Sequence, residues 1–140
     1  MCLRGASALQ QLLERDSTRL AIIVLWEHVT VSDRKMGIPT TRVLARLSDP
    51  RARQFWDPQR VVSSTMARDL PRDTLASVAE IDSTGVPLVW DCLALFRPGV
   101  RWDDRFPVPS WGGRPVIDVV DELNRKWGNP PARADTTAGR

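Results

Sequence analysis

The sequence predicts one mixed α/β domain, in which a partly parallel sheet is flanked by helices. Residues 20–26 are apolar at every position and β-branched in the middle, as in a central strand that is covered on both faces. Residues 115–127 repeat apolar side chains along one helical face, which predicts an amphipathic last helix. Helical and strand patterns alternate between these two segments. This order favours the mixed α/β class over an all-helical or all-β domain.

The other elements are predicted from local patterns in the order of the chain. Residues 6–15 carry Leu9, Leu12 and Leu13 at helical spacing. Asp57-Pro58 is a good start for a helix that ends before Pro71. We also expect a short helix at 40–47, strands at 55–56 and 88–96, a turn at 97–99, a partner strand at 100–102, and loops at 27–39 and 103–114. Residues 1–127 are predicted to form the domain, and residues 128–140 a disordered tail.

The basic charge of the chain lies at its end. The net charge is +3, with 20 basic and 17 acidic residues, but four of the basic residues and one acidic residue lie from position 125 onward. Residues 1–124 therefore carry 16 of each sign, which is no net charge. Without a basic stripe on the predicted domain, we expect no nucleic-acid partner.

Several other classes of protein are disfavoured by the sequence. The apolar run at 20–26 is too short to span a bilayer, and the N-terminus lacks a signal-peptide pattern. With Met1 as its start, the chain is predicted to be cytoplasmic; a true start upstream of Met1 would allow a periplasmic location. With Cys2, Cys92 and His28 as the only cysteines and histidine, we expect no metal site. No phosphate-binding loop is present, and no cofactor is expected.

Residues 84–100 resemble the second half of a thioredoxin fold. In that family a Val-Pro pair, with the proline in cis, precedes a strand, a glycine-containing turn, an antiparallel strand and a last helix. Val86-Pro87, the strand at 88–96, the turn at 97–99 and the helix at 115–127 come in this order. The resemblance implies that Val86 and Pro87 shape a groove for a partner chain. The alternative is a trans proline at the start of a strand, which is a common position.

The N-terminus supplies the other half of the resemblance. Cys2 and the residues up to Glu14 resemble the second cysteine of the Cys-x-x-Cys motif in thioredoxin-like proteins and the helix that comes after it. The chain is also similar to bacterial thioredoxin-like proteins of unassigned function in its segments 26–27, 55–57 and 113–116. The resemblance implies an N-terminally incomplete fold, whose first strand and first cysteine would lie upstream of Met1.

The resemblance also implies a function related to thiol–disulfide oxidoreductases. Cys2 would be the remnant catalytic thiol, with a protein thiol or disulfide as its partner. Val86, Pro87 and Glu27 would bind that partner. A dithiol cycle needs two thiols, so the chain alone would not complete one.

Three interpretations remain open beside this one. The first is a non-catalytic protein-binding module on the same fold, with Cys2 incidental. The second is a small hydrolase that uses Glu27, His28 and Asp33, which come after the central strand at the sheet edge where ligand sites usually lie.

The third concerns Asp91, which interrupts an apolar strand and either transfers a proton to a cysteine or pairs with an arginine. Cys92, one residue further on, is interpreted as a buried core thiol.

Overall fold

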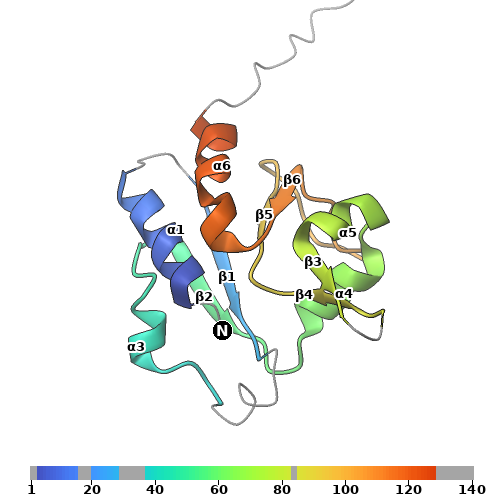
Figure 1. The fold of residues 1–140 in the computed structure, drawn as a ribbon, viewed down its shortest axis with the longest axis horizontal. Coiled ribbons are helices and arrows are strands. Elements are labelled where there is room, and N and C mark those ends of the chain that lie inside the picture. Colours follow the sequence, from blue (N-terminus) through green and yellow to red (C-terminus); the bar gives the residue numbers. More distant parts are fainter. Residues whose placement is uncertain (1–2, 16–19, 29–36, 83–84, 129–140) are drawn as a thin grey trace, which may run out of the picture.

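The computed structural model describes residues 3–15, 20–28, 37–82 and 85–128, which form a mixed α/β arrangement (Figure 1). Its elements are α1 (Leu3–Arg15), β1 (Ile22–Trp26), α3 (Thr41–Leu44), β2 (Ala52–Trp56), α4 (Val61–Asp69), α5 (Arg72–Val78), β3 (Ala79–Ile81), β4 (Pro87–Val89), β5 (Leu93–Leu95), β6 (Trp111–Gly113) and α6 (Val116–Gly128). None of the helices in the described ranges is long and apolar enough to cross a membrane. The tail predicted from residue 128 lies outside the described residues, apart from Gly128 at the end of α6.

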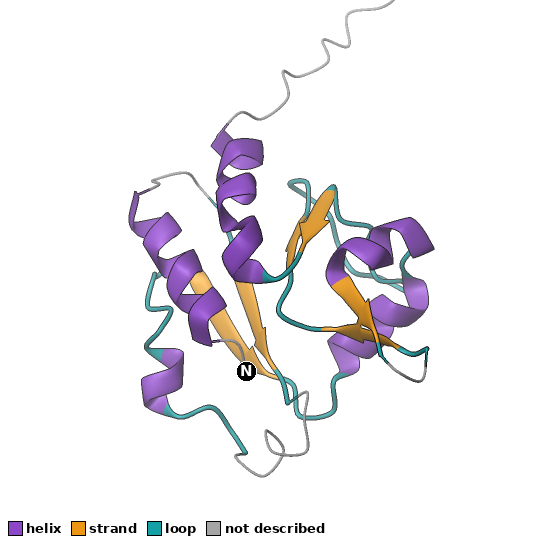
Figure 2. Ribbon diagram, viewed as in Figure 1, coloured by secondary structure: helices purple, strands orange, loops and turns teal. Residues whose placement is uncertain are grey.

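The strands of the described residues form three pairs. β1 and β2 are parallel, with Ile22 opposite Ala52 and Trp26 opposite Trp56. The pairs β3–β4 and β5–β6 are both antiparallel. Figure 2 shows α1 and α6 side by side in front of the β1–β2 pair, while α4 and α5 lie beside β3 and β4. Parallel and antiparallel strands are therefore both present, but the single mixed sheet expected from the sequence is wrong, because the strands form three separate two-stranded sheets.

A first hydrophobic core joins the two amphipathic helices to the sheets. Its buried residues are Leu9, Leu12, Leu13, Leu47, Val120 and Leu123. Ile22, Val24 and Ala52 pack against it from the β1–β2 pair, and Leu93, Leu95 and Trp111 pack against it from β5 and β6. The helical patterns read from 6–15 and 115–127 are confirmed by α1 and α6, whose apolar faces meet here.

A second hydrophobic core lies among α4, α5, β3 and β4. Its buried residues are Met66, Leu70, Leu75, Val78, Ala79 and Val89, and Val62, Ala67, Cys92 and Phe106 pack against it. The sequence predicts α4, but not α5 and β3. Residues 72–81 mix polar and apolar side chains without a strong period, so their structure depends on the packing of Leu75 and Val78 in this core.

The long strand expected over 88–96 is wrong, because the chain turns at Asp91. β4 ends at Val89 and β5 begins at Leu93, and between them Asp91 has a φ of 45°, in the left-handed region. The carbonyl oxygen of Asp91 accepts a hydrogen bond of 3.0 Å from the backbone N–H of Val116, at the start of α6. The alternation of side chains between the two faces of a strand therefore does not apply at Asp91. There the backbone bonds to the start of α6 instead of to a neighbouring strand.

The partner strand expected at 100–102 is also wrong. The turn itself is confirmed, with Gly99 at a φ of 83° and the Val100 N–H bonded to the Arg97 carbonyl at 3.3 Å. β5 pairs instead with β6, inside the segment expected to be a loop. Gly112 makes this possible, since a Cβ there would lie 2.5 Å from Cγ1 of Val78. A strand containing two glycines gives little signal in the sequence.

Candidate functional site

The residues singled out from the sequence fall into separate regions of the structure. Glu27 and His28 come directly after β1, Val86 and Pro87 lie in the β3–β4 hairpin, and Asp91 lies between β4 and β5. Cys2 and Asp33 lie outside the described residues. The chain therefore does not gather all of the predicted residues around one centre.

Glu27 is held by two residues of the segment that opens α4. The Ser63 hydroxyl donates a hydrogen bond of 2.7 Å to the Glu27 carboxylate, and Arg60 Nε lies 3.8 Å from the same oxygen. Burial raises the pKa of Glu27, although Ser63 and Arg60 act against this shift, and the negative charge of Asp57 adds to it. A carboxyl with a raised pKa can hold a proton nearer to neutral pH than an exposed glutamate does.

Arg60 has an unusual backbone and an incomplete set of partners. Its φ of 55° lies in the left-handed region, and its buried Nε has no hydrogen-bond partner among the described residues. The expected helix start at Asp57 is close: Asp57 Oδ2 accepts a hydrogen bond of 2.9 Å from the Val62 N–H, but α4 begins only at Val61. This start places Arg60 and Ser63 beside the end of β1.

His28 has a different neighbour from Glu27. Its ring lies against that of Trp56 on β2, with 6.1 Å between the ring centroids and 54° between the planes. Glu27 is directed to Ser63 and Arg60 instead. Two adjacent residues thus contact different parts of the molecule, which is what an extended chain imposes.

The cis bond expected between Val86 and Pro87 is wrong: within the described residues, the cis peptide is Arg114–Pro115. Val86 is 56% exposed, and its N–H donates to Asp82 Oδ1 at 3.0 Å in the hairpin loop. Pro87 is the first residue of β4, where an extended trans proline fits and its missing N–H costs little. Figure 1 shows this hairpin on the side of the molecule away from α1.

Asp91 lies where the first turns of α1 and α6 meet. A Cβ placed on Gly5 of α1 would be 3.0 Å from Asp91 Oδ1 and 2.8 Å from the Cβ of Val116 on α6. The glycine therefore allows a close approach of three segments that are distant in the sequence. Asp91 Oδ1 is buried and has no hydrogen-bond partner among the described residues. The arginine partner considered from the sequence is not found for this oxygen within that part of the chain.

The thiol of Cys92 is unsuited to nucleophilic chemistry. It packs against the second core, and burial raises its pKa to about 12. The negative charges of Glu27 and Asp91 act in the same direction, and the positive charge of Arg114 opposes them. A thiol with this pKa is protonated at neutral pH and reacts slowly. The interpretation of Cys92 as a core thiol agrees with this environment.

Arginine and serine side chains of this region were not recognised from the sequence. Arg114 donates from Nε to the Ala79 carbonyl at 3.0 Å and lies 3.2 Å from the Glu80 carboxylate. Ser63 is buried against Glu27, 36 positions away. Neither pairing leaves a periodic signal, because each depends on how distant segments pack. Among the described residues, no three metal-binding side chains gather into a possible metal site.

Comparisons of this chain with protein-family models, with curated proteins and with solved structures found no match. Its function is therefore argued from the arrangement of its own residues.

Proposed function

We propose that this chain is a thioredoxin-like domain related to thiol–disulfide oxidoreductases, in which Cys2 is the only thiol that exchanges. The order of elements supports the proposal. A helix leads into an apolar strand with a parallel neighbour, and an antiparallel pair, β5–β6, leads into the last helix. The first and last helices pack against each other in the first core.

The observation that carries the proposal is the environment at the start of α1. The helix begins at Leu3, the residue after Cys2 in the chain, and its first turn meets the buried, unpartnered carboxyl oxygen of Asp91. A helix N-terminus stabilises a thiolate, and a nearby carboxyl group is able to accept or return a proton. Cys92 cannot take this role, because its pKa is raised to about 12.

The proposed reaction is thiol–disulfide exchange with a mixed disulfide between a protein and a small thiol. The Cys2 thiolate attacks the sulfur of the small thiol, a bond forms between these two sulfurs, and the protein sulfur leaves as a thiolate that takes up a proton. A second small thiol, as its thiolate, then attacks the small-thiol sulfur held by Cys2. This step forms the disulfide of the small thiol and frees the Cys2 thiolate. The external small thiol is oxidised, and the protein thiol is the reduced product.

The test is reduction of a glutathionylated peptide with glutathione as the reductant. We expect turnover with the unaltered chain and with Cys92→Ala, and none above background with Cys2→Ser. Circular dichroism of each variant controls for folding. Turnover that survives Cys2→Ser, or is absent from the folded wild-type chain, would overturn the proposal.

A second candidate function is a non-catalytic protein-binding module on the same fold. The observation that favours it is the half-buried thiol of Cys92, whose pKa of about 12 leaves no second reactive thiol among the described residues to resolve a mixed disulfide. Under this alternative, Cys2→Ser leaves binding of any partner unchanged. The turnover assay separates the two functions, because only the first depends on Cys2.

A further inference from the structure

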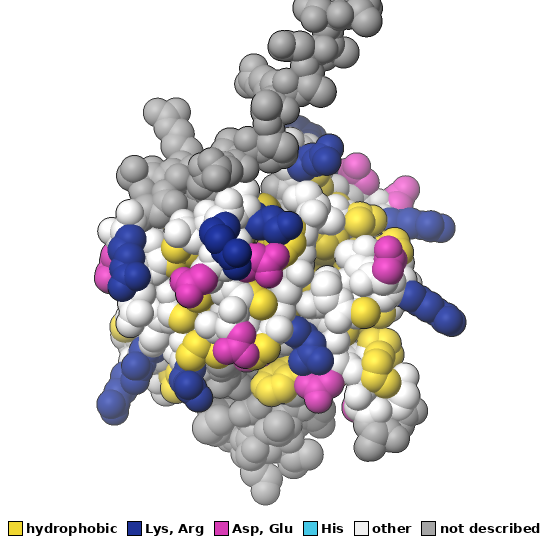
Figure 3. Space-filling view, turned by 45° about the horizontal axis from the view of Figure 1, so that its top comes forward, with side chains coloured by type: hydrophobic (Ala, Val, Ile, Leu, Met, Phe, Trp, Pro, Cys, Tyr) yellow, Lys and Arg dark blue, Asp and Glu magenta, His cyan; other side chains and the backbone are white. Residues whose placement is uncertain are grey.

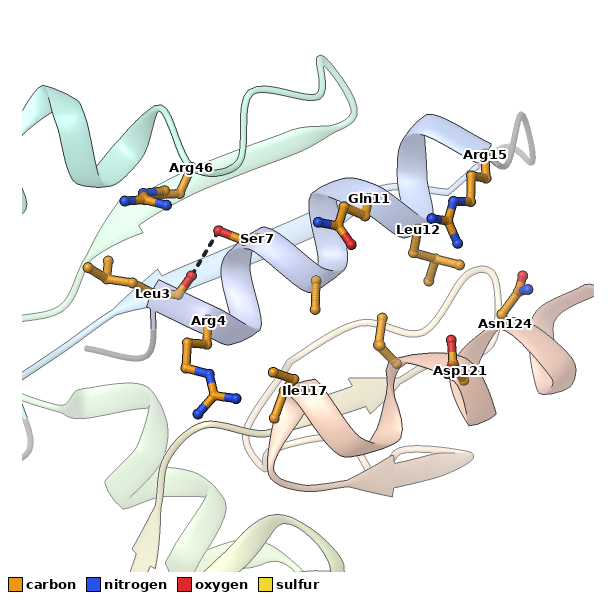
Figure 4. A pocket seen from close by; sticks show the side chains of 12 residues that line it. Leu3, Arg4, Ser7, Gln11, Leu12, Arg15, Arg46, Ile117, Asp121 and Asn124 are labelled. Carbon is orange, nitrogen blue, oxygen red and sulfur yellow. Dashed lines mark hydrogen bonds between the residues drawn. The ribbon is translucent and has the colours of Figure 1, made fainter.

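A groove of about 850 Å³ runs between α1 and α6, on the outer side of the first core (Figure 4). Leu12 of α1 and Val120 of α6, both buried in the first core, form the apolar floor of the groove. At one end, the exposed side chain of Ile117 adds further apolar surface. Polar side chains, among them Ser7 and Gln11, form much of the remaining lining. A groove between two helices with an apolar floor is a common docking place for a third helix.

Two arginines of α1 stand along this groove. Arg4 and Arg15 extend from opposite ends of α1 on the side of α6 (Figure 4). They are eleven residues apart, which is close to three helical turns, so they share one face at a separation of about 16 Å. Neither guanidinium group forms an ion pair or hydrogen bond with another residue in the part of the chain that the structure describes.

The charge around the groove is unbalanced toward positive. Arg46 is a third arginine of its lining, and Asp121 is the single acidic residue among the lining residues described. An occupant with carboxylates would therefore meet two or three cations and one anion. Charge complementarity of this kind sets the orientation and the rate of association of two proteins.

We propose that this groove binds an acidic amphipathic helix of a partner protein. Its apolar residues would cover Ile117 and rest on the floor formed by Leu12 and Val120, and two carboxylates about eleven residues apart would reach Arg4 and Arg15. A membrane surface fits less well, because an anionic bilayer needs a continuous basic face. In Figure 3, basic and acidic side chains are interspersed over the face in view. This proposal does not depend on thiol exchange at Cys2.

The test is a selection from a displayed library of amphipathic helical peptides of about 15 residues, with the full chain immobilised. We expect the recovered peptides to carry two acidic residues about three turns apart, with leucine-like residues between them. Recovery of neutral or basic peptides, or of no binder, would overturn the proposal.

The recovered peptide is then titrated by fluorescence anisotropy against charge-reversal variants. Arg4→Glu with Arg15→Glu should weaken binding about ten-fold or more. The matched control, Arg97→Glu with Arg101→Glu, changes the same charge at two exposed positions away from the groove and should leave the affinity within about two-fold. Equal binding by both double variants would contradict the proposal. So would sedimentation with phosphatidylglycerol vesicles that depends on Arg4 and Arg15, combined with no peptide binding.

Discussion

The two hydrophobic cores differ in how far apart their residues lie in the sequence. The first core joins α1 to α6, so that Leu9 and Leu123 belong to one cluster. The second core is built mainly from residues 62–92, with Phe106 added from a later loop. A core assembled from both ends of the described chain depends on the whole fold. A core assembled from neighbouring segments can adjust locally when one side chain is lost.

The candidate site lies where the two cores meet. Cys92 packs against the second core, and Leu93, the next residue, packs against the first. Asp91, directly before them, contacts the first turns of α1 and α6. This position places the half-buried Cys92 at the boundary between the two cores. We therefore expect the two cores to unfold together.

The largest expected effect comes from a matched pair of leucine truncations. Leu123 in the first core and Leu70 in the second are both 6% exposed. Each Leu→Ala change should lower the free energy of unfolding by about 2–5 kcal/mol. Leu123→Ala should lower the free energy of unfolding by more than Leu70→Ala does. The helices and strands around Leu123 are fixed by several other segments, so they cannot move in to fill the cavity. Urea denaturation followed by tryptophan fluorescence and by circular dichroism gives both values.

The same titrations test whether the cores are coupled. We expect one transition for each variant, with the two probes coincident. Two separated transitions in Leu70→Ala, or a larger loss for Leu70→Ala than for Leu123→Ala, would contradict the comparison.

The next effect concerns the close approach at Gly5. A glycine-to-alanine change inside a helix normally stabilises it by about 0.5–1 kcal/mol. Here the new Cβ would lie 2.8 Å from the Cβ of Val116 and 3.0 Å from Asp91 Oδ1, so α1 must shift. We expect Gly5→Ala to destabilise the protein by about 1–3 kcal/mol, as overpacking does. Thermal denaturation measures it, with exposed Gln11→Ala on the same helix as the control. A stabilised Gly5→Ala protein would show that the three segments do not meet as described.

The smallest effect is a pH dependence at Glu27. Burial raises its folded pKa above the ordinary value of 4.5. The unfolded chain therefore loses this proton at a lower pH than the folded protein does. Protonation of Glu27 stabilises the folded protein fully below the unfolded pKa, and this stabilisation is lost as the pH rises through the raised folded pKa. Glu27→Gln keeps an acceptor for Ser63 without the charge. The stability of the variant relative to the wild type should increase from pH 4 to pH 7, in paired denaturations at each pH. A difference that is constant or of opposite sign would contradict the burial of this carboxylate.

The sequence predicts the parts of the fold that depend on local periodicity. Leu9, Leu12 and Leu13 predict α1, and Val116, Val120 and Leu123 predict α6, because amphipathic spacing reports which face is buried. It fails where one backbone position redirects the chain. Asp91 ends an apolar run by adopting a left-handed φ, and Gly112 forms a strand through its close approach to Val78.

The site is less accessible to prediction than the fold. Glu27 and Asp91 were singled out as carboxylates at strand ends or within an apolar run, and both have constrained surroundings in the structure. The sequence does not reveal the roles of Ser63, Arg60 and Arg114. Ser63 and Arg60 contact Glu27, and Arg114 contacts β3, so each partner is 33 to 36 positions away in the chain. The cis bond at Pro87 is predicted from a Val-Pro dipeptide, whereas in the structure Pro87 is a trans proline at the start of β4.

The most direct test of the proposed function is alkylation of the native chain by iodoacetamide, read at each cysteine by peptide mass spectrometry. We expect Cys2 to react at neutral pH at least as fast as a cysteine in an unfolded peptide, and Cys92 to react only once urea unfolds the chain. Slow reaction of Cys2 under conditions that keep the chain folded, or rapid reaction of Cys92 under the same conditions, would contradict the account.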